Sequence, residues 1–124
     1  MNVKIDTREK FHAISIQETA LAANMTEELS RRILPILQNG VKNVVLSLKD
    51  IQTLDIAAGE ALVALQQRFY ENNASFVVCC LAKKVEATLD AEGLLELVNF
   101  APTEAEAADI VLMEEIERDL LDEV

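Results

Sequence analysis

The sequence predicts an α/β domain, with a mostly parallel central β-sheet, an N-terminal β-hairpin and about four helices packed on the sheet. Short β-branched runs alternate with segments of helical periodicity, which is typical of parallel strands joined by crossover helices. Of the 124 residues, 51% are apolar, and only three glycines and two prolines are present. This composition favours one packed core over a disordered chain. Four phenylalanines and one tyrosine make up the aromatic residues, so the core should be mainly aliphatic.

The N-terminal hairpin is predicted from two segments of period two. Apolar and polar residues alternate over residues 3–7 and again over 11–16, and residues 8–10 between them are all charged. Two such runs with a short polar connection indicate antiparallel strands. His12, the single histidine, falls on the second strand, where a structural role at the surface or half-buried is expected.

The first helix is predicted downstream of this hairpin. Asn24 or Thr26 can cap it, and apolar residues follow at helical spacing. Pro35 lies inside the pattern and should remove a hydrogen bond and kink the helix. Asn39-Gly40 is a helix stop.

The middle of the chain repeats strand and helix. Residues 43–48 and 75–81 are short apolar runs rich in valine, as expected of interior strands covered on both faces. A helix is expected over residues 56–71 and a shorter one over 83–91, and residues 95–100 are expected to form another strand. The order of elements is therefore β-β-α-β-α-β-α-β-α.

The last helix should follow Pro102. Thr103 and Glu106 have the spacing of a capping box. We assign residues 1–112 to the domain and 113–124 to an acidic C-terminal helical extension. We expect residues 114–124 of the extension to modulate contacts with a partner or between protomers.

The charge and the cysteines limit the classes of function. Residues 1–82 hold nine acidic and eight basic residues, whereas residues 83–124 hold thirteen acidic and three basic ones. An acidic half repels nucleic-acid phosphates, so we expect no nucleic-acid partner. No apolar run approaches the roughly 20 residues that span a membrane, and no signal pattern opens the chain, so we expect a cytoplasmic protein without direct membrane insertion. On a strand, Cys79 and Cys80 would point to opposite faces.

Catalytic motifs are absent from the sequence. It contains no glycine-rich nucleotide-binding pattern and no H-E-x-x-H motif. Asp50 and Asp55 bracket a turn, but a pair of carboxylates needs a metal or substrate framework to do chemistry. We therefore expect no enzyme, no catalytic residue, no metal and no cofactor.

The stretch T-L-D-I-A-A-G-E-A-L, residues 53–62, joins a strand to a helix. Ligands and partners of open parallel sheets gather at such turns. Asp55 is placed to cap the helix with its carboxylate. Ala57, Ala58 and Gly59 make the first helical turn small, which allows another chain to approach closely.

The chain resembles the STAS domain family in four stretches. These are L-K-D-I-Q-T-L-D-I-A-A-G-E-A-L, a helix that ends at N-N, S-F-V-V-C-C-L, and K-V-E-A-T-L-D-A-E-G-L-L-E-L. No stretch is specific alone, but their spacing is consistent over about residues 3–112. The resemblance implies a single STAS-like domain that acts as a bacterial anti-sigma factor antagonist in a partner-switching pathway. Such a module binds an anti-sigma factor or serine kinase-like protein and is released by phosphorylation at the start of the second helix.

The resemblance also implies that this chain lacks the phosphorylation site by which such modules release their partner. The phosphoacceptor position corresponds to Ala57, or to Ala58 with one inserted residue, and Ala22 occupies the position of an Asp beside it. Thr53 and Thr88 remain alternative modification sites. The implied partner-binding residues are Ala22, Ala23, Asn24, Thr53, Asp55, Ile56, Ala57, Ala58, Gly59 and Glu60.

Two other roles within the family remain open. One is an accessory subunit of a membrane lipid-transport ABC complex, and the other is a stressosome-like scaffold. The sequence also leaves a homodimer open. Co-purification with an ATP-binding transport subunit would favour the first of these roles.

Overall fold

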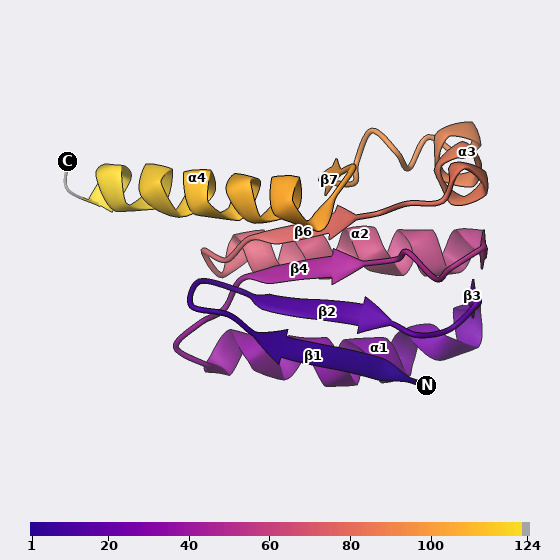
Figure 1. The fold of residues 1–124 in the computed structure, drawn as a ribbon, viewed down its shortest axis with the longest axis horizontal. Coiled ribbons are helices and arrows are strands. Elements are labelled where there is room, and N and C mark those ends of the chain that lie inside the picture. Colours follow the sequence, from indigo (N-terminus) through magenta and orange to yellow (C-terminus); the bar gives the residue numbers. More distant parts are fainter. Residues whose placement is uncertain (123–124) are drawn as a thin grey trace.

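The computed structural model describes residues 1–122 and contains a five-stranded sheet in the order β1-β2-β4-β6-β7 (Figure 1). β1 runs antiparallel to β2, and the other neighbours are parallel. The mostly parallel sheet and the N-terminal hairpin of the predicted fold are thus confirmed. The strands are β1 (Val3–Thr7), β2 (His12–Ile16), β4 (Val44–Ser47), β6 (Phe76–Cys79) and β7 (Phe100–Ala101).

Helices cover both faces of this sheet. α1 (Thr26–Ile33) and α2 (Ile56–Glu71) lie on one face, and α4 (Glu104–Asp122) lies on the other. α3 (Lys83–Ala91) packs beside the start of α2. Every residue of β4 and β6 is buried, which explains why both strands read as continuous apolar runs.

Alternation along the strands divides the core in two. In β4, Leu46 packs with the α1 and α2 side, whereas Val45 packs with α4. In β6, Val78 and Val77 divide in the same way. Successive strand residues point to opposite faces, so α4 has its own small aliphatic core with Val45 and Val77.

The first helix differs from the expectation at both ends. The chain enters it through a 3-10 turn, η1 (Ala23–Met25), and no side chain caps α1. The Thr26 hydroxyl instead donates a hydrogen bond to the Ala23 carbonyl. At Pro35 the chain continues as a second 3-10 segment, η2 (Leu34–Gln38), because proline cannot donate the next helical hydrogen bond. The expected stop at Asn39-Gly40 is confirmed.

The predicted strand over residues 95–100 is wrong. The amides of Leu94 and Leu95 donate to the Leu89 carbonyl, so this stretch closes α3 as a turn, and only Phe100 and Ala101 pair with β6. Two short strands were absent from the expected order. β3 (Ala20–Leu21) and β5 (Thr53–Leu54) pair in parallel as a separate two-stranded sheet.

The two cysteines do not point to opposite faces as predicted. Cys80 lies after β6 with a φ of 64°, and its thiol comes within 3.4 Å of the Cys79 thiol. Burial, followed by the contact with Cys80, raises the pKa of Cys79 to about 12.

Helices capable of crossing a membrane are not found among residues 1–122.

Candidate functional site

Two chain segments that the sequence singled out lie side by side at one edge of the sheet. Pairing of Leu21 with Leu54 brings residues 22–24, after β3, next to the turn between β5 and α2. In Figure 1 this edge is the one toward which the arrowheads of β2 and β4 point, near the β3 label. It is the carboxyl end of the parallel strands, where small α/β domains bind their ligands and partners.

Asp55 joins the two segments. Its backbone amide donates to the Leu21 carbonyl at 3.0 Å, and its carboxylate accepts a hydrogen bond from the Ala23 amide at 3.0 Å. The prediction that this carboxylate caps α2 is wrong, because it makes no hydrogen bond to the first turn of that helix. The carboxylate instead accepts its hydrogen bond from the Ala23 amide, which is distant in sequence. Asp55 therefore links the two segments into one continuous surface.

The backbone amides at the start of α2 have no side-chain partner. No side chain caps it, and its first turn contains no acidic residue. The unpaired amides of a helix N-terminus carry about half a positive charge. Ile56 is 43% exposed beside them, and the Ala57 methyl is exposed on the next position. The edge therefore offers hydrogen-bond donors next to a small apolar patch.

Seven of the ten expected surface residues are exposed, one is half-buried and two are buried. The exposed set comprises Ala23, Asn24, Thr53, Asp55, Ile56, Ala57 and Glu60, and Ala22 is half-buried. Ala58 and Gly59 are buried in the core instead, and so cannot touch a partner. A Cβ at Gly59 would lie 3.0 Å from side-chain atoms of both Leu89 and Leu94. Its small size serves the packing of α3 against α2.

Among residues 1–122, no three His, Cys, Asp or Glu side chains come together as metal ligands. His12 is buried near the opposite end of β2, not at the surface or half-buried as predicted, and one ring nitrogen is hydrogen-bonded to the Val41 carbonyl and the other to the Thr7 hydroxyl. Asp50 is exposed in the middle of the loop between β4 and β5. This edge presents the amides at the start of α2 and the exposed side chains of Ile56 and Ala57.

Two contacts of this edge have no signal in the sequence. The Ala23 amide reaches Asp55, and the Gln52 amide donates to the Thr19 carbonyl at 2.7 Å. Each joins residues more than thirty positions apart. Their donors are backbone amides, which nearly every residue has, so no particular residue type in the sequence indicates these contacts. Only the pairing of β3 with β5 reveals them.

Comparison with known proteins adds family information to this geometry. A family model described as the STAS domain matches residues 2–107, and so ends within the first turn of α4. Among solved structures, a Moorella thermoacetica RsbS variant has a TM-score of 0.75 at 18% identity, covering 95% of this chain and 99% of that chain. An anti-sigma factor antagonist from Mycobacterium paratuberculosis has a TM-score of 0.75 at 14% identity, with 89% and 92% covered. The Bacillus anti-sigma factor antagonist SpoIIAA in its unphosphorylated form has a TM-score of 0.69 at 15% identity, covering 89% of this chain and 96% of that chain.

Proposed function

Because the chain belongs to the STAS domain family, we propose that it is a non-catalytic regulatory module that binds a protein partner at the edge formed by β3, β5 and the start of α2. The main support for this proposal is the hydrogen bond between the Asp55 carboxylate and the Ala23 amide. It fastens the loop before α1 to the loop before α2 and leaves Ile56 and Ala57 exposed on the joined surface. A surface held in place in this way loses little conformational entropy when it binds.

The proposed partner is an anti-sigma factor or a serine kinase-like protein of a bacterial, cytoplasmic partner-switching pathway. Two of the similar structures are described as anti-sigma factor antagonists, which supports this class of partner. The open amides at the start of α2 suit an acidic or carbonyl group from the partner. The exposed Ile56 supplies apolar contact area next to them.

We further propose that phosphorylation at the family's usual position, the start of α2, does not release the partner. Neither Ala57 nor Ala58 has a hydroxyl group, and Ala58 is buried as well. The half-buried Ala22 adds no carboxylate beside the site. Binding would then be controlled by the amount of protein or by competition between partners.

Affinity purification of the tagged full-length protein from its native cell, followed by mass spectrometry, tests the proposal. An anti-sigma factor or kinase should be enriched, and Ala57→Glu should weaken its binding at least tenfold, with Ala57→Gln as the neutral control of similar size. Recovery of an ATP-binding transport subunit at the same edge would favour the accessory-subunit alternative. Incubation with the recovered kinase and ATP should leave the intact mass unchanged, and a gained phosphoryl group would contradict the missing switch.

A further inference from the structure

The second half of α4 presents an apolar stripe to solvent. Ile116 follows two of its members by three and four residues and precedes the last by four, so all four lie on one side of the helix, with exposed fractions between 39% and 61%. We call them the α4 stripe: Leu112, Met113, Ile116 and Leu120. Large apolar side chains scattered singly on a surface are ordinary, whereas a contiguous row of four marks an interaction site.

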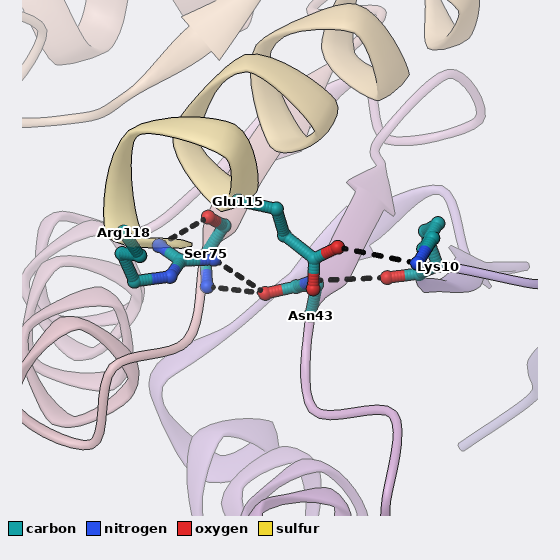
Figure 2. Close-up of polar contacts among 5 residues, drawn as sticks. All are labelled: Lys10, Asn43, Ser75, Glu115 and Arg118. Atoms are coloured by element: carbon teal, nitrogen blue, oxygen red, sulfur yellow. Dashed lines mark hydrogen bonds and ion pairs between the residues drawn. The ribbon is translucent and has the colours of Figure 1, made fainter. Parts of the chain in front are cut away.

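The side of α4 that faces its own domain is polar over the same turns. Arg118 donates hydrogen bonds to the Ser75 hydroxyl at 3.1 Å and to the Asn43 side-chain oxygen at 3.2 Å. Asn43 in turn donates to Glu115 at 2.9 Å, and Lys10 lies 4.0 Å from that carboxylate. Figure 2 shows Arg118 and Glu115 directed from α4 toward this cluster.

These contacts determine which side of α4 faces outward. A surface helix normally buries its apolar side and exposes its polar side, but here the arrangement is reversed. Turning the α4 stripe inward would strip Glu115 and Arg118 of their partners and bury apolar groups against Asn43. The helix is therefore held with its apolar side outward.

Charged residues border the α4 stripe, and all of them are acidic. Asp109 lies on the same side of the helix one turn before Leu112 and Met113, Asp119 lies on one flank, and Glu106 and Glu117 lie on the other; all four are exposed. A second copy of this chain would place these carboxylates against one another, and an anionic membrane would repel them. Complementarity requires a partner with positive charge around an apolar row.

We propose that the α4 stripe binds an amphipathic helix of another protein whose apolar side is bordered by lysine and arginine. Apolar residues at helical spacing on that segment would pack between Leu112 and Leu120, and its cations would face Asp119 and Glu117. In Figure 1 the last turns of α4 lie at the opposite end of the molecule from β3. The α4 stripe and the β3–β5–α2 edge can therefore be occupied at the same time.

The test begins with a photo-reactive phenylalanine derivative at Ile116 of the full chain in the native cell, and the same group at the exposed Ala87 of α3 as the control. The segment cross-linked only from position 116 is sequenced and synthesised, and its affinity for the purified protein is measured by calorimetry. We expect a basic amphipathic helix whose affinity falls at least tenfold with Ile116→Asp and several-fold with Asp119→Lys or on raising the salt from 50 to 500 mM, since exposed charges are screened (roughly a 10 Å range at 0.1 M).

Four results would overturn the proposal. They are cross-linking only to a second copy of this chain, no difference between positions 116 and 87, an acidic or non-helical segment, and an affinity unchanged by both substitutions. Circular dichroism and urea unfolding confirm that each variant is folded. Ala57→Glu, measured against the same segment, separates this site from the proposed partner edge, because it should weaken only the anti-sigma or kinase partner.

Discussion

Asn43 should be among the most costly polar residues to replace, and Asn43→Ala tests this directly. The side chain is 3% exposed and makes four hydrogen bonds. Its amide nitrogen donates to the Lys10 carbonyl and to Glu115, both at 2.9 Å, and its oxygen accepts from the Ser75 amide at 2.8 Å and from Arg118. One residue thus links the β1–β2 turn, β4, β6 and α4 (Figure 2).

The expected loss in the free energy of unfolding is about 4 kcal/mol, the centre of a range of roughly 2.5–6 kcal/mol. Ser75 is fully buried, so its amide would lose its partner out of reach of water, at about 1–3 kcal/mol. The other three bonds contribute roughly 0.5–1 kcal/mol each, since Glu115 and Arg118 are half-buried and water can replace part of the contact. Urea unfolding at pH 7 should report the loss as a lower midpoint with an unchanged slope.

Two further variants make this prediction refutable. Asn24→Ala removes an exposed asparagine and should change the free energy of unfolding by no more than about 0.5 kcal/mol. Arg118→Ala combined with Asn43→Ala should cost less than the sum of the single changes, because the two side chains share one network. A loss below about 1 kcal/mol for Asn43→Ala, or strict additivity of the pair, would refute the reasoning.

Three other predictions follow from the structure. Ala57→Glu should leave the free energy of unfolding within about 0.5 kcal/mol of wild type in urea, because a gain of about 0.3–1 kcal/mol at the open helix start offsets the lower helix propensity of glutamate; a loss above 1 kcal/mol would contradict the open end of α2. Burial, then the hydrogen bond to Glu114, raises the pKa of Tyr70 to about 12 from 10.0, so the folded state favours the neutral phenol. The stabilisation from the neutral Tyr70 phenol is complete below pH 10 and is lost toward pH 12. Across this range, the free energy of unfolding in urea should fall less steeply with pH for Tyr70→Phe than for the wild type. Equal slopes would exclude the effect. Because the pKa of Cys79 is about 12 and this thiol is buried, mass spectrometry should find one maleimide per native chain, at Cys80, and two in urea; rapid double labelling of the native protein would be inconsistent with this burial.

Local patterns predicted much of this fold. The apolar runs of β4 and β6 and the helix from Ile56 to Glu71 are visible because their burial determines their composition. The failures come from distant partners. A capping rule for Asp55 considers only the next helical turn, whereas the Ala23 amide arrives from another loop. In the same way, nothing near Arg118 in the sequence indicates Ser75.

The leucine-rich stretch after α3 misled for a different reason. Residues 94–98 have the composition of a strand, but Leu94 packs near Gly59 and the amides of the stretch fold back on α3. The strand-to-helix pattern indicated residues 53–62 of the edge, whereas residues 22–24 were indicated only by the family resemblance. Burial of Ala58 was not, since helical phase relative to the sheet depends on how α2 packs.

The position of α4 has a consequence for synthesis of the chain in the cell. Val45 and Val77 are covered by α4 on their side of the sheet, and α4 leaves the ribosome after every strand of that sheet. At about 5–20 residues per second, its nineteen residues take roughly 1–4 s to translate. During this interval an apolar sheet face stays uncovered on the nascent chain. Deleting α4 should therefore send newly made protein to chaperones or aggregates.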